Sequence, residues 1–513
     1  MTATSIERLV TSTQARITSN QLAIVAFLLG VAITLAYRPF SQPVKGDVGI
    51  YDYIAQSILR GQVPYRDVID PKAPVSMYIS AIAMAAGRSV GVRDVVAVRW
   101  LNALMAGLLL ALNFLVAESY LKSRLAGVIA ALVPLLPENF ASMMTKGTQP
   151  KLPMMLFGML TLLLIAKQRP FLSGFFSMLA CLCWQPGLMF TGVAVLMFSR
   201  YLTKWNDGQA LNVVAGAAVP LAMLLSYFYA LGALAQLWSW TITYTYSVFA
   251  PEGQKQIGQA FVLMWKIIRR ELGSDMILWG LSVIGFGMFA WKRIQDKFKE
   301  GFRSNELFRD AILIPPVVYL IFCTIDFQGG PDLIPFLPFI GVFAGWFFVQ
   351  LGQIGARSSL IEKTRYSFDW AVVVPSIAIG VMLFLLILRT TRYKPPESDL
   401  QTQKAAVSRI ADYLGPTDKI YVHGTAEILV LLNRPNLNPY IALDSGADDY
   451  IAQHRPGGFK DVLAELETAS PKVVAISRLR NVRHGRELEN WVMEHYDELN
   501  LPGLEGVYIR KKG

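Results

Sequence analysis

The sequence predicts a polytopic α-helical membrane protein that carries a small α/β domain at its C-terminus. Two observations support this fold class. Of the 513 residues, 53% are hydrophobic and only 17% are charged, and the mean hydropathy is +0.40. Before about residue 390 the apolar residues form blocks of roughly 15 to 22, close to the ~20 that a helix needs to cross a bilayer. These blocks mostly lack the periodicity that a soluble protein would show.

We expect about eleven membrane spans. The first, "QLAIVAFLLGVAITLAY", is too long for the apolar region of a signal peptide and is followed by no cleavage site, so it is an uncleaved span. The segment "VSMYISAIAMAAGRSVGV" after Pro74 is short and contains Gly87 and Arg88, which favours an interfacial helix over a further span. The predicted spans are 21–38, 97–119, 124–141, 152–166, 170–184, 187–202, 210–230, 275–291, 310–325, 333–350 and 369–388.

Basic residues give the expected orientation, because Lys and Arg beside the spans stay in the cytoplasm. Arg8 and Arg16 precede the first span, which places the N-terminus inside. Basic loops then alternate with loops rich in aromatic, Gly and Pro residues, and an odd number of spans puts the tail outside. The basic clusters are Lys122/Arg124, Lys167/Arg169, Arg200/Lys204, Lys292/Arg293/Lys297/Lys299/Arg303/Arg309 and Arg357/Lys363/Arg365.

Residues 392–513 have the pattern of a separate domain, after a membrane part that comprises residues 1–391. "KIYVHG", "PYIAL", "KVVAIS" and "GVYIRK" predict short strands, whereas "AAVSRIADYLG", "FKDVLAELETA" and "RELENWVMEHYDEL" have apolar residues at helical spacing. Such alternation is typical of an α/β domain, and about 120 residues can bury a core. All four histidines lie here without metal-ligand spacing, which favours structural or surface roles.

Composition also excludes some functions. The three cysteines fall within predicted spans, so a disulfide framework outside the cell is not expected. The net charge of +11 belongs largely to the cytoplasmic loops and the basic tail. It therefore indicates contact with anionic membrane lipids, and we expect no nucleic-acid partner.

The loop between the first two spans, residues 41–96, concentrates acids at the expected membrane surface. "GDVGIYDYIAQSILRGQVPYRDVIDPKAP" contains four aspartates, and its first half has the spacing of a surface helix. A phosphate-bearing lipid donor needs a cation at headgroup depth, which Lys72 and Arg66 could supply. A hydroxyl acceptor needs a general base, which Asp47 could supply. From residue types alone, ordinary solvated loop charges and salt bridges are the favoured explanation of the pattern.

The same stretch resembles the first outer loop of the C-type (GT-C) membrane glycosyltransferases, especially the bacterial protein O-mannosyltransferase and aminoarabinose transferase families. Later segments such as "CWQPGL", "DLIPFLPFIGVFAGW" and "DKIYVHGTAEILVLLNRP" extend the resemblance over nearly the whole chain, but only the loop is diagnostic. The matching residues of the loop are Asp47-Val48-Gly49, Tyr51, Tyr53, the run from Leu59 through Gly61, Pro64 and Tyr65 to Asp67, and Lys72-Ala73-Pro74.

The resemblance implies transfer of a sugar from a polyprenyl-phosphate donor to a protein, lipid or glycan acceptor, with inversion, on the outer face of a bacterial-type cytoplasmic membrane. Asp47 would then be the catalytic base, and Lys72, helped by Arg66, would hold the donor phosphate. Asp70, Tyr51, Tyr65 and Asp67 would support the site.

Some features depart from this family pattern. Val48 replaces the usual second acid, and no histidine lies in the membrane part, so we predict no metal or other cofactor, although aspartates could still hold Mg²⁺ or Mn²⁺. Arg269 and Arg270 could contact a lipid phosphate or anchor the membrane interface. A polytopic transporter or lipid flippase is the alternative class, and a non-catalytic scaffold is a third, but no repeated halves or mid-membrane charges favour a transporter.

Overall fold

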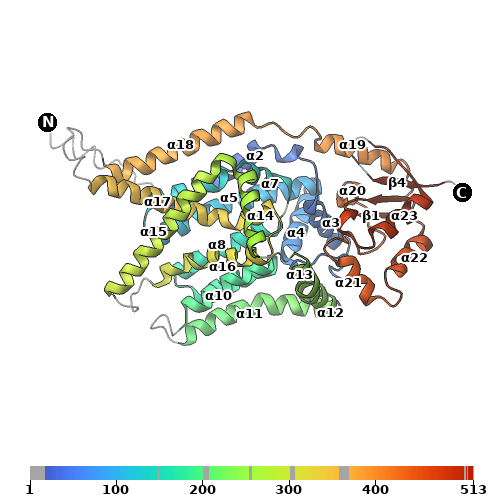
Figure 1. Cartoon of the computed structure of the whole chain (residues 1–513), viewed down its shortest axis with the longest axis horizontal. Coiled ribbons are helices and arrows are strands. Elements are labelled where there is room, and N and C mark those ends of the chain that lie inside the picture. The colour runs from blue at the N-terminus through green and yellow to red at the C-terminus, as the bar shows by residue number, and fades with distance from the viewer. Residues whose placement is uncertain are drawn as a thin grey trace.

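The computed structural model describes residues 18–147, 149–199, 207–253, 257–300, 307–357, 369–501, 504 and 506–511. A helical bundle forms most of the molecule, and a smaller region with a sheet caps one end of it (Figure 1). Several residues used above to predict the orientation lie outside the described residues, namely Arg8, Arg16, Arg200, Lys204, Arg303, Lys363 and Arg365.

Every predicted span overlaps an apolar helix, which confirms the predicted fold class. In the described part of the chain, seven helical stretches are long and apolar enough to cross a membrane, and four more apolar helices have 10–17 residues. The span predicted at 124–141 is too long, because its helix gives way at Val133 to a 3-10 turn. The bundle helices are α2 (Ser19–Ala36), α5 (Asp94–Leu121), α6 (Arg124–Leu132), α8 (Lys151–Ala166), α9 (Pro170–Cys183), α10 (Leu188–Met197), α11 (Asp207–Ala230), α15 (Met276–Glu300), α16 (Ile314–Ile325), α17 (Leu337–Arg357) and α18 (Trp370–Arg392).

Small residues let the bundle helices approach closely, as is usual where apolar helices pack without water. A Cβ on Gly345 of α17 would lie 2.4 Å from the carbonyl oxygen of Ala126 on α6. A Cβ on Gly216 of α11 would lie 2.0 Å from the carbonyl oxygen of Phe171 on α9. These close contacts between neighbouring helices stabilise the bundle.

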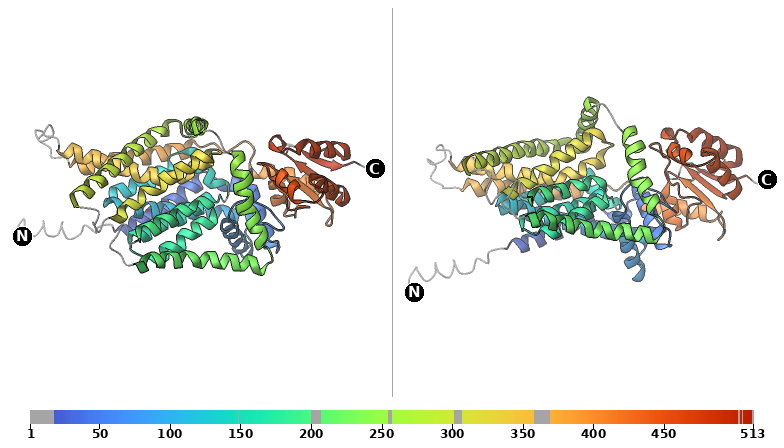
Figure 2. Two further views of the ribbon diagram at one scale, coloured as in Figure 1. Left: turned by 60° about the horizontal axis from the view of Figure 1, so that its bottom comes forward. Right: turned by 90° about the horizontal axis from the view of Figure 1, so that it is seen from below.

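Two connections cover the end of the bundle that faces the C-terminal region. The first contains α3 (Asp47–Leu59) and α4 (Val75–Ser89). The second contains α12 (Leu234–Trp238), the π-helix η4 (Ser239–Phe249), α13 (Ala250–Gly253) and α14 (Ile257–Leu272), so the stretch 231–275, which we expected to be a loop, is largely helical. Figure 2 shows α12, η4 and α13 standing across the end of the bundle.

The C-terminal region is a four-stranded sheet with helices around it. The strand order is β1-β2-β4-β3, with β1 and β2 parallel and the other pairs antiparallel. Its elements are α19 (Leu400–Ala411), β1 (Ile420–His423), α20 (Ala426–Leu432), α21 (Ala447–His454), α22 (Phe459–Ala469), β2 (Val473–Ile476), α23 (Gly485–His495), β3 (Tyr496–Glu498) and β4 (Val507–Arg510).

The predicted strands at β1, β2 and β4 are confirmed, but two other expectations were wrong. "PYIAL" forms no strand: its Pro439 has no N–H to donate to a ladder, and its carbonyl instead accepts from the N–H of Ile69 at 3.2 Å. The helix expected over residues 486–499 ends at His495, because Tyr496–Glu498 pairs with β4 as β3.

The first connection and the C-terminal region share one hydrophobic core. Tyr53 and Ile54 of α3 are buried in the same cluster as Ile428 and Leu429 of α20 and Val473 of β2. The Tyr53 hydroxyl also accepts a 2.7 Å hydrogen bond from the backbone of Asn436. As a result, α3 is fixed between the bundle and the C-terminal region.

Candidate active site

A cavity of about 170 Å³ opens where α3, η4 and the C-terminal region meet. It contains three of the residues singled out in the sequence, namely Asp47, Asp70 and Lys72. The rest of its wall comes from elements far apart along the chain. The other lining residues are Ile50, Ile69, Pro71, Trp240, Tyr244, Phe249, Gln328, Ala442, Asp444, Ser445, Ala447 and Arg478.

Asp47 is the first residue of α3, where its negative charge is favoured by the helix dipole. Gly46 before it has φ +64, and a Cβ there would lie 3.0 Å from the guanidinium of Arg478, so glycine meets both constraints. The Asp47 carboxylate is 55% exposed and lies 3.4 Å from Arg478 Nη1. Partial burial would raise its pKa, but the charges of Lys72, Arg478 and Lys151 outweigh this and lower it below 3.8. Asp47 is therefore ionised at neutral pH.

Asp70 and Tyr51 hold Lys72 in place. Its Nζ lies 3.8 Å from Asp70 Oδ2 and 5.3 Å from the ring centroid of Tyr51, and Asp70 Oδ1 accepts from its backbone N–H at 2.9 Å. Burial would lower the pKa of Lys72, but Asp70, Tyr51 and Asp47 raise it well above 10.5. The same burial raises the pKa of Asp70. The ammonium is a fixed positive charge beside the Asp47 carboxylate.

Two buried tyrosines, Tyr51 and Tyr65, contact Lys72. Both are buried, with exposures of 3% and 1%. The Tyr65 hydroxyl donates a 2.7 Å hydrogen bond to the backbone carbonyl of Lys72. Tyr65 also adopts φ +70 in the turn after Pro64. The two tyrosines thus fix the backbone and the side chain of Lys72.

The remaining predicted cations lie outside the cavity lining. Arg66 forms a two-point ion pair with Asp67 and donates to the carbonyl of Leu231 at 3.1 Å. Asp67 in turn accepts from the N–H of Val63 at 2.8 Å, which closes the turn. Arg269 and Arg270 are exposed on α14. The structure brings together Asp47, Asp70, Lys72 and Tyr51, and places these three arginines elsewhere.

Sequence reasoning missed the ion pair between Lys151 and Asp332, which lies close enough to the cavity for Lys151 to act on Asp47. Lys151 Nζ lies 2.8 Å from Asp332 Oδ1 and stacks over the Trp184 ring. Asp332 Oδ2 accepts from the backbone N–H groups of Gln328 and Gly329, which positions Gln328 in the cavity wall. A signal existed, since "GTQPK" and "GGPD" each put one charge at the start of a span, where a charge needs a partner.

The wall from the C-terminal region was also missed. Arg478 follows β2, and Asp444 and Ser445 precede α21. Tyr244 of η4 donates a 2.8 Å hydrogen bond to the Ser445 carbonyl, which ties the two sides together. No spacing in the sequence indicates this, because the contacts join residues about 200 to 430 positions apart.

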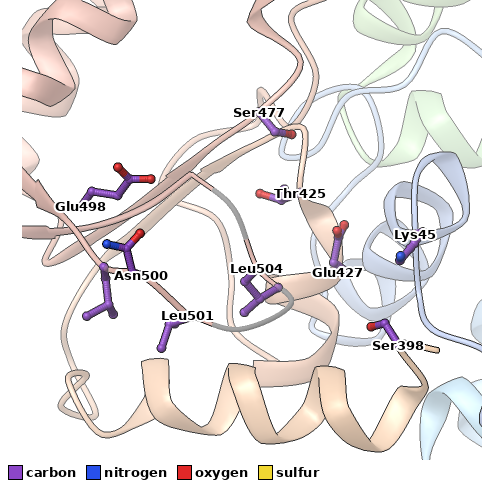
Figure 3. Close-up of a pocket in the computed structure, with 10 residues that line it drawn as sticks. Lys45, Ser398, Thr425, Glu427, Ser477, Glu498, Asn500, Leu501 and Leu504 are labelled. Carbon is purple, nitrogen blue, oxygen red and sulfur yellow. The ribbon is translucent and has the colours of Figure 1, made fainter.

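A second, larger pocket of about 750 Å³ is lined by Lys45, which lies shortly before α3, and by residues between positions 398 and 504 (Figure 3). Seven of its ten lining residues are polar, namely Lys45, Ser398, Thr425, Glu427, Ser477, Glu498 and Asn500. Glu427 packs against Gly49, where a Cβ would lie 3.1 Å from the Glu427 backbone nitrogen. Burial raises the pKa of Glu427. Ser477 lines this pocket, and the next residue, Arg478, lines the first cavity.

Three acids line the first cavity, and two of them, Asp47 and Asp70, already face other groups of the protein. Asp47 faces Arg478, and both oxygens of Asp70 face the backbone or ammonium of Lys72. Among the described residues, the group of three close His, Cys, Asp or Glu side chains is Asp448, Asp449 and His484, which lies outside the cavity lining.

No family model and no curated protein matches this chain. Solved structures do match. ArnT from Cupriavidus metallidurans bound to undecaprenyl phosphate is 14% identical, with a TM-score of 0.61 over 95% of this chain and 97% of that one. Its apo state gives a TM-score of 0.60 at 14% identity, over 94% of this chain and 97% of that one.

The Archaeoglobus fulgidus oligosaccharyltransferase, tethered to an acceptor peptide containing the NVT sequon, is 11% identical. The match extends over 96% of this chain and 74% of the oligosaccharyltransferase, with a TM-score of 0.53. ArnT is an aminoarabinose transferase, and both proteins have the GT-C fold. This multi-pass membrane chain therefore has the GT-C fold that its first loop predicts.

Proposed function

We propose that this protein is an inverting membrane glycosyltransferase that uses a polyprenyl-phosphate-linked sugar. One observation supports this most: a carboxylate and an ammonium face the same cavity at the end of a membrane bundle with the GT-C fold. That pairing suits a reaction that removes a proton from one partner while negative charge grows on the other.

In the proposed reaction the acceptor hydroxyl attacks the anomeric carbon from the face opposite the phosphate. The new C–O bond forms as the bond to the phosphate oxygen breaks, and the electron pair leaves with the lipid phosphate. Lys72 binds the phosphate as its charge grows. Asp47 receives the acceptor proton, an assistance typically worth ~10²- to 10⁴-fold. Because the pKa of Asp47 is lowered, we expect the proton to move late, when the attacking oxygen is already cationic.

The other predicted residues take indirect parts in this proposal. Tyr51, Tyr65 and Asp70 hold Lys72, and Asp67 with Arg66 closes the turn that precedes it. We assign no phosphate contact to Arg66, Arg269 or Arg270. Arg478 in the cavity wall and Lys151 outside the lining both add positive charge near Asp47.

We also propose that the cavity lies on the outer face of a bacterial-type cytoplasmic membrane. The N-terminus would then be inside, with residues 1–391 forming the membrane domain and residues 392–513 an outer domain. Among the described residues there are seven long and four shorter apolar helices, and eleven crossings would place the two termini on opposite sides of the membrane.

The test is sugar transfer from a labelled polyprenyl-phosphate donor by purified wild type and Asp47→Asn. Asp94→Asn is a matched control, because Asp94 also begins a helix and pairs with an arginine, Arg88 at 2.7 Å, but lies outside the cavity lining. We expect transfer to fall at least ~10²-fold in Asp47→Asn and to persist in the control. Equal transfer by both variants would refute the base, and movement of intact lipid without transfer would favour a flippase.

A further inference from the structure

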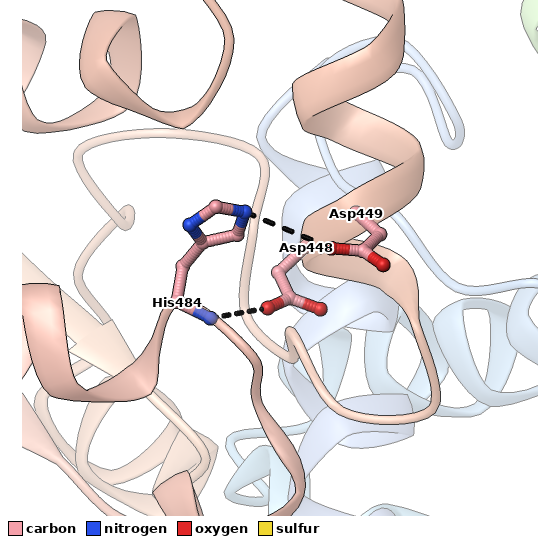
Figure 4. A group of neighbouring side chains, drawn as sticks. All are labelled: Asp448, Asp449 and His484. Carbon is pink, nitrogen blue, oxygen red and sulfur yellow. Dashed lines mark hydrogen bonds and ion pairs between the residues drawn. The ribbon is translucent and has the colours of Figure 1, made fainter.

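Three side chains of the C-terminal region converge on one point outside the candidate active site (Figure 4). Asp448 and Asp449 lie in the first turn of α21, and His484 directly precedes α23. One ligand atom from each lies within 4.8 Å of the others. We propose that these residues bind one divalent metal ion, best matched by Zn²⁺, which fastens the C-terminal wall of the cavity.

The first support is the state of Asp448. Its side chain is 0% exposed, and its Oδ2 accepts the backbone N–H of His484 at 2.8 Å. Its Oδ1 has no hydrogen-bond partner among the residues that the structure describes. Figure 4 shows this second oxygen directed toward the side of Asp449. A buried carboxylate oxygen without a partner is costly, and a cation placed between the two acids would remove that cost.

The second support is the orientation of His484. Its Nδ1 lies 3.0 Å from Glu487 Oε1, and its ring stacks on Phe459 at 4.6 Å with an interplanar angle of 10°. A proton on Nδ1 shared with Glu487 leaves the lone pair on Nε2, on the side of Asp449. Metal-bound histidines usually make such a bond to a carboxylate through the other ring nitrogen.

The third support is the spacing of the ligands. His484 Nε2 and Asp449 Oδ1 are 3.6 Å apart, which is longer than a hydrogen bond. Ligands at 2.0–2.1 Å around a tetrahedral ion are roughly 3.4 Å from each other. The Arg483 guanidinium pairs with Asp449 Oδ2, on the other oxygen of that carboxylate. Two carboxylates and an imidazole suit Zn²⁺ better than Mg²⁺, which prefers oxygen ligands alone.

An ion here would connect both C-terminal segments that line the cavity. Asp444 and Ser445 come just before the two aspartates, and Arg478 comes six residues before His484. Metal binding would therefore hold Arg478 near Asp47. This positioning effect depends on the proposed function, whereas the metal site itself does not.

The test uses the full-length protein in detergent, stripped with a chelator and titrated with Zn²⁺ against a chromophoric competitor. We expect wild type to take up one zinc ion per chain, and Asp448→Asn and His484→Gln to lose it. Glu487→Gln, an exposed change that should not disturb folding, should weaken zinc affinity ~10- to 100-fold. His495→Gln is the matched control and should bind as wild type, since the His495 ring contacts a backbone carbonyl.

Two outcomes would overturn the site: no zinc uptake by the stripped wild type at micromolar Zn²⁺, or equal affinity in wild type, His484→Gln and Glu487→Gln. Substitution with Co²⁺ gives a second readout, because a four-coordinate nitrogen–oxygen site should produce visible absorption bands that His484→Gln abolishes. Asp47→Asn should keep full zinc binding. A failure of the glycosyltransferase proposal would therefore leave this result intact.

Discussion

Replacing Lys72 with Met should separate its structural role from its chemical one. The Nζ of Lys72 lies 3.8 Å from Asp70 Oδ2, and the Asp70 side chain is only 7% exposed. At an effective dielectric constant of about 20, two charges at this distance attract by ~4 kcal/mol. Leaving Asp70 buried without its partner should therefore lower the free energy of unfolding by about 3–5 kcal/mol. Loss of phosphate stabilisation should also reduce kcat by on the order of 10²- to 10³-fold.

The double variant Lys72→Met/Asp70→Asn distinguishes these two effects. It removes both charges, so the melting temperature in detergent should return toward that of wild type. Transfer from the labelled lipid donor should remain reduced, because no cation faces the phosphate. If the double variant recovered both stability and transfer, Lys72 would act only as a structural partner of Asp70, and the assignment of the phosphate site would be wrong.

Three further perturbations test other parts of the structure. Arg478→Gln should raise the pKa of Asp47, so the acid limb of the pH profile of kcat/KM should move to higher pH; an unchanged limb would show that Asp47 is not the titrating base. Burial lowers the pKa of His423 from 6.5 to about 4. Above pH 6.5 the ring is neutral in both the folded and the unfolded chain. As the pH falls from 6.5 to 4, only the unfolded chain gains the proton, so the free energy of unfolding should fall by about 3 kcal/mol. Thermal unfolding of wild type and of the non-titrating His423→Gln over this pH range measures this loss. Parallel plots of melting temperature against pH for the two proteins would contradict it. Gly147→Ala should lower both stability and transfer, because φ is +149 and a Cβ would lie 2.2 Å from Val48 Cγ1, beside Asp47; a variant with normal melting temperature and transfer would exclude this contact.

The helical part of the fold was predictable because the bilayer imposes a simple rule on the sequence. Each span needs an apolar segment of fixed length, and such segments are visible without knowledge of any contact. The strands of the C-terminal region were partly predictable, since β1 and β2 are short apolar runs. "PYIAL" is also a short apolar run, but it forms no strand, and the carbonyls of Pro439 and Ile441 instead accept single backbone hydrogen bonds from Ile69 and Gly424.

The candidate site was predictable only where its residues are close in the chain. Asp47, Asp70 and Lys72 lie within 26 positions on one loop, so a single motif contains them. Arg478 reaches the same carboxylate from 431 positions away. The proposed metal ligands Asp448 and His484 likewise come together only in the folded chain, where the residue before α23 contacts the first turn of α21. Their spacing carries no signal, since they are 36 positions apart in the chain.

The core shared by α3 and the C-terminal region has a consequence for biosynthesis. Tyr53 and Ile54 emerge from the ribosome early, but the C-terminal residues that cover them, from Leu400 to Val507, are made only after the membrane helices. A nascent chain that has completed all its membrane helices still carries an uncovered apolar surface on α3. Messages truncated after residue 392 should therefore yield a product that is inserted into the bilayer yet recognised by quality-control proteases.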